Sequence, residues 1–273
     1  SLNSANFNAG RLIGPAASGL MIVAFGTGVS FLVNSLTYLI LVVGLLALRR
    51  DELHIAVKPN GDAKLREAVQ YVLSTRNLLL VMLAVLFSTT FGLNFQIFTA
   101  LMATKEFGKG PAEFGLLGSV LAVGSFTGVL IAARLEHRRV PKFIMAGATL
   151  FGLMLCVTAW MPTYVSYAVS LPWTGLVALV TLISANSYVQ TNCEPTLRGR
   201  VMGIYLLIFM GGTPLGSPLI GWLAEVVGVR MTIMLCGLIV AAAGATLLVV
   251  LRRGGSQPSS VRSPVQHGPE TNA

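Results

Sequence analysis

Long runs of uncharged, apolar residues are the feature that most limits what this chain can fold into. Only 11% of the 273 residues are Asp, Glu, Lys or Arg, whereas a soluble domain carries about a quarter. The few charges are clustered, and the runs between them reach the roughly 20 residues that a helix needs to cross the hydrocarbon core of a bilayer. The sequence therefore predicts an all-α polytopic membrane protein.

Eight of these runs are predicted to be membrane spans. They cover residues 10–26, 28–48, 78–102, 114–134, 143–162, 166–191, 201–223 and 230–251. The first two are joined by almost no chain and should form a tight helical hairpin. In the polar connection 49–77, apolar residues recur at helical spacing from Leu65 to Leu73, which predicts a short amphipathic helix that either lies on the membrane surface or is simply solvated. From Gly254 onward, the Ser-, Pro- and Gly-rich composition predicts a disordered tail.

The Lys and Arg residues predict an orientation. Sixteen of the nineteen lie in alternate connections or near the chain ends, and only Lys105, Lys109 and Arg230 fall on the other side. By the positive-inside rule the basic side is cytoplasmic, so we predict a multi-pass protein of the cell (plasma or inner) membrane with both termini in the cytoplasm. Because the basic residues lie in short turns between apolar runs, membrane anchoring explains the net charge of +9 better than nucleic-acid binding does, and no nucleic-acid partner is expected.

Two segments containing proline and glycine indicate an internal duplication. When Pro218 is aligned with Pro15, an offset of 203 residues, the arginine pair 252–253 falls on the pair 49–50. In each copy a Pro- and Gly-containing helix, a very short outer turn and an apolar helix precede the arginine pair. Six spans separate the matched points, which predicts a parallel repeat of six-helix bundles, a known transporter plan. The chain would then correspond to helices 5–12 of twelve, with the first four absent.

Several segments resemble the major facilitator superfamily, and in particular its drug- and siderophore-exporter branch. NAGRLIGPAASG, residues 8–19, is similar to the proline-glycine motif in the fifth helix of antiporters, and FLVNSLTYL, residues 31–39, resembles the sixth helix of this branch. REAVQYVLSTRNLL, residues 66–79, resembles the segment that leads into the seventh helix. PTLRGRVMGIY, residues 195–205, and the following GGTPLGSPLIGWLAE resemble the tenth-to-eleventh loop and the eleventh helix. The resemblance implies a major-facilitator-type helical bundle that transports by alternating access.

The proline- and glycine-containing helices are the first candidate functional segments. Small residues let another helix approach closely, and the hydrogen bond that proline removes is tolerated in a membrane helix because neighbouring groups satisfy the carbonyl. The resemblance implies that these helices contact the opposite bundle and influence which side opens, while a simple packing kink is the alternative. The residues of this gating and helix-packing motif are Arg11, Gly14, Pro15, Gly19, Pro214, Gly216, Pro218 and Gly221.

Polar residues within the spans are candidates for a substrate cavity. Thr90 and Asn94 are four residues apart and share a helical face, and so do Asn186 and Gln190. Uncharged amides inside a membrane either hold helices together or line a wet cavity. The resemblance places a central cavity partly along these two helices, so we expect these four residues to line it.

Arginines at the predicted cytoplasmic ends are candidates for a gate, with solvated topology signals as the alternative. They are Arg138, Arg139, Arg198 and Arg200. The loop RLEHRRVPK, residues 134–142, lies where the family keeps a basic loop, but Glu136 stands where an aspartate is usual and the glycine is missing, so this loop matches the family's gate poorly.

Ionisable residues are missing from the middle of the predicted spans. No Asp, Glu, His, Lys or Arg lies deep in any of them, so a proton-coupling group, usually an intramembrane carboxylate, would belong to the absent helices. The three His and three Cys residues are scattered without ligand spacing, and no nucleophile constellation or nucleotide-binding loop is present. We therefore expect no metal, no cofactor and no enzymatic activity.

These observations predict four parts. Residues 1–48 are the last two helices of an N-terminal bundle, 49–77 a cytoplasmic linker, 78–251 a C-terminal six-helix bundle, and 252–273 a cytoplasmic tail. The favoured function is secondary active export of a hydrophobic or amphipathic small molecule, a drug or a siderophore, by alternating access with proton antiport. The alternatives are an importer of the same fold and a truncated or regulatory membrane protein without transport. The expected partners are the bilayer, the substrate, and either the missing N-terminal helices or a partner chain that completes the transporter.

Overall fold

The computed structural model describes residues 31–47, 65–135 and 140–253, together with residues 21, 25, 28 and 29. Most of the predicted first span lies outside these residues. So do the motif residues Arg11, Gly14, Pro15 and Gly19, the loop arginines Arg138 and Arg139, and the tail beyond residue 253. Within the span predicted over 28–48, the described residues include the apolar helix Phe31–Leu46, and its role as a membrane span stays a prediction.

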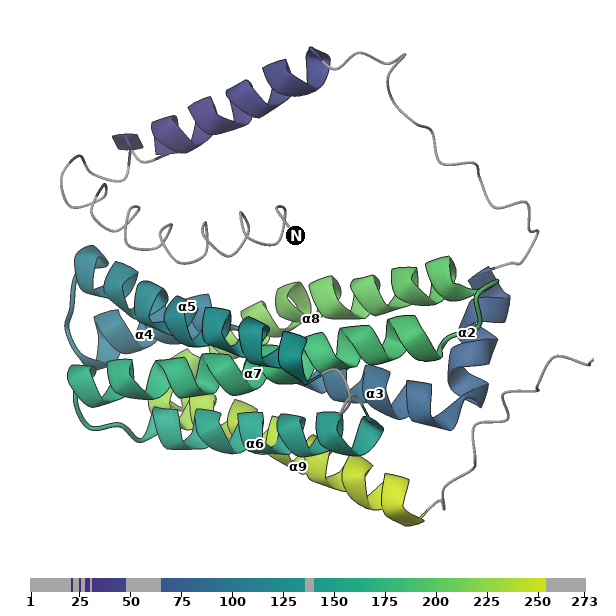
Figure 1. The fold of residues 1–273 in the computed structure, drawn as a ribbon. Coiled ribbons are helices and arrows are strands. Elements are labelled where there is room, and N and C mark those ends of the chain that lie inside the picture. The colour runs from purple at the N-terminus through teal and green to yellow at the C-terminus, as the bar shows by residue number, and fades with distance from the viewer. Residues whose placement is uncertain are drawn as a thin grey trace, which may run out of the picture.

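Six helices of the described chain are long and apolar enough to cross a membrane. They are α3 to η3 (Arg76–Glu106, in four consecutive segments), α5 (Pro111–Arg134), α6 (Pro141–Ala159), α7 (Tyr164–Asn192), α8 (Arg198–Val226) and α9 (Val229–Arg253). Their ends lie within four residues of the ends predicted for the third to eighth spans. Figure 1 shows them packed side by side, and the short connections make successive helices antiparallel.

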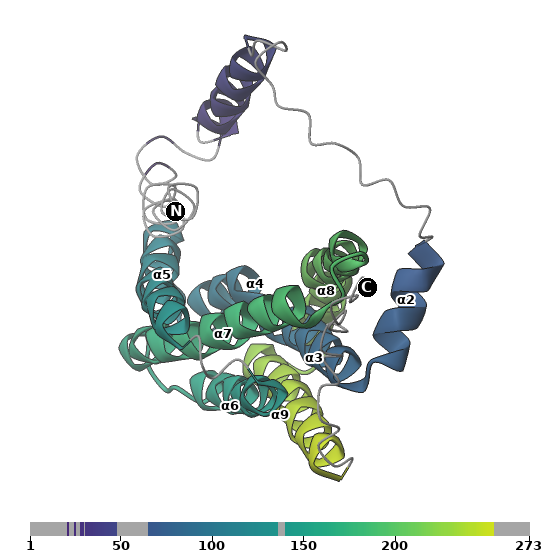
Figure 2. The ribbon, with the colours of Figure 1, turned by 45° about the vertical axis from the view of Figure 1, so that its right-hand side comes forward.

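The helix α2 (Leu65–Ser74) runs across one end of this bundle, as both views show (Figures 1 and 2). Ala68 and Val72 are buried in a cluster with residues of α3 and α8, and the Tyr71 hydroxyl accepts a hydrogen bond from the backbone amide of Glu194 at 3.3 Å. The helix predicted within the linker is therefore confirmed, while its position relative to a membrane stays a prediction.

The first of the six spans is interrupted, which the sequence analysis did not predict. The helix α3 (Arg76–Phe87) widens into a π-helical turn, η2 (Ser88–Gly92), and the backbone leaves the helix at Leu93 and Asn94. It resumes as α4 (Phe95–Leu101) and a second π-helical turn, η3 (Met102–Glu106). The span is thus two helical pieces joined at residues 93–94.

Glycines mark the places where helix backbones approach most closely. A side chain at Gly124 of α5 would collide with the backbone of Pro172 of α7, and one at Gly128 would lie only 2.6 Å from the carbonyl of Leu176. A side chain at Gly152 of α6 would likewise collide with the backbone of α9. These small residues hold α5 against α7 and α6 against α9 in the way that small residues commonly do in membrane bundles.

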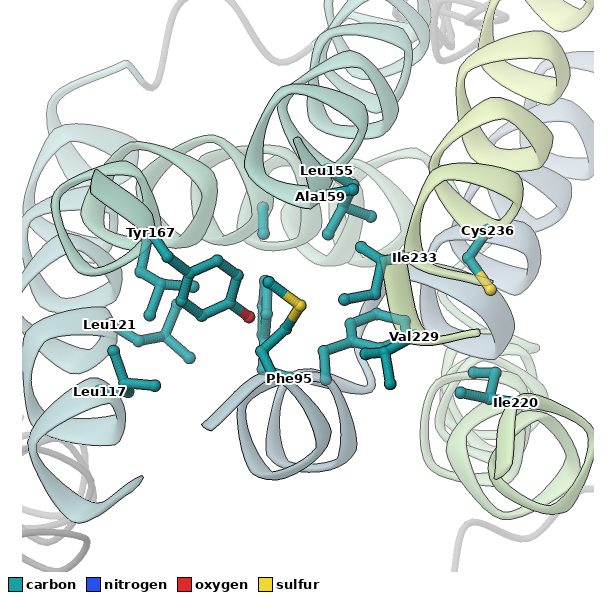
Figure 3. Packing of buried hydrophobic residues seen from close by; sticks show 14 of the residues in the cluster. Phe95, Leu117, Leu121, Leu155, Ala159, Tyr167, Ile220, Val229, Ile233 and Cys236 are labelled. Carbon is teal, nitrogen blue, oxygen red and sulfur yellow. The ribbon is translucent and has the colours of Figure 1, made fainter. Parts of the chain in front are cut away.

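The main apolar core lies where the six spans converge (Figure 3). Phe95 of α4 and Tyr167 of α7 lie at its centre, with Leu117 of α5, Leu155 of α6 and Ile233 of α9 around them. Tyr167 and Leu155 are each only 1% exposed, so protein encloses both side chains.

A single arginine ties three spans together at the end of the bundle opposite α2. The Nε of Arg230 lies 2.9 Å from the carboxylate of Glu106, and its Nη1 donates to the carbonyls of Ala159 at 3.1 Å and Met161 at 2.7 Å. The guanidinium also lies over the Phe107 ring, 5.6 Å from its centroid. This cluster joins the ends of η3 and α6 to the start of α9.

Candidate substrate pocket and helix-packing site

A small pocket of about 160 Å³ lies between α7 and α8. Its walls are mostly apolar, from Leu179, Leu182, Ile183 and Phe209, and its polar groups come from Asn186 and Tyr205. The Oδ1 of Asn186 accepts a hydrogen bond from the Nε2 of Gln190, and the Tyr205 hydroxyl donates to the carbonyl of Leu182 at 3.4 Å. Asn186 therefore lies in this pocket, whereas Gln190 is exposed and is not among its lining residues. That these residues line a substrate cavity stays a prediction.

The other predicted pair, Thr90 and Asn94, lies at a helix–helix contact and does not line this pocket. Asn94 is 2% exposed; its Nδ2 donates to the Thr90 carbonyl at 2.8 Å, and its Oδ1 accepts from the Ser217 hydroxyl at 3.2 Å. The Thr90 hydroxyl is buried without a hydrogen-bond partner among the described residues. The Asn94 side chain thus joins the break at residues 93–94 to α8.

Glycines of α8 complete this contact. A side chain at Gly216 would collide with the Thr90 carbonyl, and one at Gly212 would collide with the Thr89 hydroxyl. The sequence analysis named Gly216 but missed Gly212. The Gly-x-x-x-Gly spacing of these two residues, a known small-residue packing pattern in membrane helices, is the signal that would have identified both.

The remaining motif residues of α8 point away from the contact. Pro214 and Pro218 lie inside the continuous helix on an exposed face, beside Leu215, which is 73% exposed. A side chain at Gly221 would meet open space. Of the six spans, α8 is the least buried: only 22% of its most apolar 18-residue stretch is buried inside the protein. The predicted contact of this face with an opposite bundle stays a prediction.

The charged residues of the described spans lie close to helix ends. Glu113 is in the first turn of α5, and Glu225 is next to the last residue of α8. Arg198 is exposed at the start of α8 and Arg200 is half-buried, so the part they would play in a gate stays a prediction. Within the described ranges, no group of three His, Cys, Asp or Glu side chains could hold a metal ion.

The amino-acid sequence matches a known family along almost the whole chain. The family model MFS_3, described as transmembrane secretion effector, matches residues 1–271. The chain belongs to the major facilitator superfamily. This result confirms the resemblance and the all-α membrane fold class, and it places the chain in a superfamily of transporters rather than of enzymes.

Curated relatives of this superfamily member are transport proteins at low identity. The staphyloferrin A transporter of Staphylococcus aureus is 22% identical over 242 residues, 87% of this chain and 60% of the relative. The multidrug efflux pump Tap of Mycobacterium tuberculosis is 26% identical over 252 residues, 90% of this chain and 59% of the relative. The enterobactin exporter EntS of Salmonella typhimurium is 26% identical over 142 residues, 51% of this chain and 34% of the relative. The chain thus spans about 60% of the length of the first two.

Proposed function

We propose that this chain is part of a secondary active exporter that moves a hydrophobic or amphipathic small molecule by alternating access. The observation that carries the proposal is the α7–α8 pocket, where Asn186 and Tyr205 are the polar groups of a mostly apolar wall and Asn186 accepts a hydrogen bond from Gln190. A mostly apolar surface with a few polar groups suits a ligand of mixed polarity. The names of the relatives, which include an efflux pump and transporters of siderophores, support export of such a molecule.

The pocket also supports the proposal that further helices complete the substrate cavity. Its volume of about 160 Å³ is below the roughly 300 to 1,000 Å³ of typical small-molecule sites. The adjoining face of α8, with Pro214, Leu215 and Pro218, is exposed. We propose that the N-terminal helices of a complete transporter, or those of a partner chain, cover this face and enlarge the pocket into a cavity.

Proton antiport is the proposed coupling, and its proton-binding residue is assigned to those completing helices. Such a residue is usually a carboxylate within the membrane. The charged side chains of the described spans lie near helix ends instead. The α7–α8 pocket is therefore proposed to contribute contacts with the substrate rather than the residue that binds the coupled proton.

The experiment that tests this function is an efflux assay on the complete reading frame, expressed in cells that lack their own efflux pumps. We expect expression to lower the accumulation of a lipophilic fluorescent dye, and a protonophore to abolish the effect. Asn186→Ala should restore accumulation without lowering the amount of protein in the membrane. Asn192→Ala is the matched control, because Asn192 is exposed near the end of α7 and outside the pocket. Increased accumulation on expression would indicate import, and no change would indicate a protein without transport activity toward this class.

A further inference from the structure

A second and larger hollow lies on a different face of the bundle, between α6 and α7. It has a volume of about 530 Å³, and its walls include Met154 and Val157 of α6 and Val165, Val169 and Trp173 of α7. None of its lining residues belongs to α8 or to the α7–α8 pocket. We call this hollow the α6–α7 groove. Val165, Val169 and Trp173 are 68%, 62% and 63% exposed, so the groove is open on the outer surface of two membrane-spanning helices.

The hydroxyl groups around the groove already have hydrogen-bond partners within the protein. Thr158 and Thr174 bond to each other at 2.9 Å, and Thr174 also donates to a carbonyl of its own helix. Ser170 donates to the Tyr167 carbonyl at 2.7 Å. Thr163 and Ser166 bond to each other at 3.0 Å in the cap of α7. Since these donors are used internally, a ligand gains nothing by bringing hydrogen-bond acceptors, and the groove favours an apolar occupant.

The length of the groove matches one leaflet of a bilayer. Along α7 it extends from the cap residue Thr163 to Thr174, which is about 16 Å at the helical rise per residue. Half of a hydrocarbon core is about 15 Å thick. The groove also ends at the α6–α7 connection, where Trp160 is 64% exposed, and tryptophan is typical of the boundary between hydrocarbon and headgroups.

We propose that the α6–α7 groove binds one acyl chain of a phospholipid in the leaflet that meets the α6–α7 connection. The chain lies against Val165, Val169 and Trp173, and the headgroup lies at the level of Trp160 and Thr163. The predicted orientation makes this the outer leaflet. Such a lipid fills a hollow that faces hydrocarbon and that the described helices leave open.

Trp173 serves as the reporter in the test, because it is one of only three tryptophans in the chain. Variants of the full chain keep Trp173 alone, or Trp222 alone, with the other two replaced by Phe. Trp222 is the matched control, since it is 60% exposed on α8 and outside the groove. Phosphatidylcholine with brominated acyl chains is titrated into the protein in detergent micelles. We expect Trp173 to lose about half of its emission at the lipid concentration that half-fills the groove, while Trp222 is quenched less at the same lipid ratio.

A blocking variant tests the place of binding. Val169→Phe, introduced with Trp173 alone, should fill the groove and reduce quenching to the Trp222 level. Val123→Phe is its control, because Val123 is 53% exposed on α5 and outside the groove. Val165→Phe replaces Val169→Phe if the latter does not elute as folded protein on size exclusion. Equal quenching of Trp173 and Trp222 at every lipid ratio would overturn the proposal, and so would preferential quenching that survives the blocking variant. A Trp173 that resists quenching throughout would mean that protein, not lipid, covers the groove.

Discussion

The two spans that meet at Thr90 and Gly216 differ in where their irregular positions lie. The break in the first span is in a buried region, and the prolines of α8 are on an exposed face. The span from α3 to η3 has a broken backbone and is the most buried of the six, with 61% of its most apolar window inside the protein. The helix α8 contains two prolines, continues through both, and has only 22% of its window inside. A broken backbone in a membrane must be satisfied by protein, and here Asn94 and α8 provide that protection.

The difference separates an irregularity that the fold explains from one that it does not. The break at residues 93–94 has its partners in place, because Asn94 bonds to the Thr90 carbonyl and to Ser217. Pro214 and Pro218 lie on the exposed side of α8, so the packing of the described residues gives no reason for them. The break at residues 93–94 is therefore expected to matter mainly for stability, and the two prolines mainly for transport.

Crowding the contact between the two spans should have the largest effect on stability. Gly216→Leu places a side chain against the backbone of Thr90, where relaxation is difficult, so we expect destabilisation at or above the usual 1 to 3 kcal/mol of overpacking, on the order of 3 kcal/mol. Thermal unfolding followed by size exclusion of the detergent-solubilised chain measures it. Gly221→Leu is the control, because that position meets open space. Equal stability of the two variants would show that the close contact does not exist.

Removing the amide at the break should have the next largest effect. Asn94→Ala removes the buried amide that donates to the partly buried Thr90 carbonyl, while the Ser217 hydroxyl keeps its bond to the Thr213 carbonyl, so we expect a loss of about 1 kcal/mol. The free energy of unfolding in a denaturing-detergent titration measures the loss. Asn186→Ala, in the half-buried pocket of α7, should cost less stability and affect transport more. Reversal of that order would mean that the roles assigned to the two asparagines are exchanged.

Substitutions of Arg230 test whether its cluster stabilises the second piece of the broken span, α4 and η3, against α6 and α9. Arg230→Gln leaves the carbonyls of Ala159 and Met161 without their charged donor, and we expect a loss of about 1 kcal/mol in stability. Glu106→Gln removes only a partly exposed ion pair and should cost about 0.5 kcal/mol. If both variants unfold at the wild-type temperature, the cluster does not contribute to holding η3 against α6 and α9.

Replacing the exposed prolines should have the smallest effect on stability. Pro218→Ala restores a helical amide at an exposed position, so stability should stay within about 0.5 kcal/mol of the original or rise. Under the proposed function, the same variant should slow efflux by the complete transporter, because the exposed face of α8 is proposed to meet the opposite bundle. A clear loss of stability with unchanged efflux would make the prolines packing residues after all.

Much of the helix architecture could be predicted from composition alone. The third to eighth spans follow from uncharged runs bounded by charges, and their observed ends lie within four residues of the predicted ones. The linker helix was recognisable because apolar residues recur at helical spacing between Leu65 and Leu73. These features are local, so a single sequence contains the information that fixes them.

The break and the use of Asn94 depend on partners that are distant in sequence. Gly92 fits against Phe151 of α6, and Asn94 bonds to Ser217 of α8, so hydropathy could not separate a helix-packing asparagine from a cavity-lining one. The segment Gly92-Leu93-Asn94 does contain two residues typical of helix ends, which was the available local signal. Asn186 was predicted as a cavity residue on the same argument; it lies in a small pocket between α7 and α8, and its contact with a substrate stays a prediction.

The proline and break positions lie in the three longest spans, the ones with the greatest mismatch to the thickness of a membrane. The spans from α3 to η3, α7 and α8 contain 31, 29 and 29 residues, and each is irregular inside, at residues 93–94, at Pro172, and at Pro214 and Pro218. The helices α5, α6 and α9, with 24, 19 and 25 residues, have no proline beyond their first turn. A straight helix of 29 residues is about 43 Å long, well above a hydrocarbon core of about 30 Å. Hydrophobic mismatch of this kind is relieved by tilting or kinking. We therefore expect a change of lipid chain length to be accommodated by bending of the three long spans at these positions rather than by bending of the three short ones.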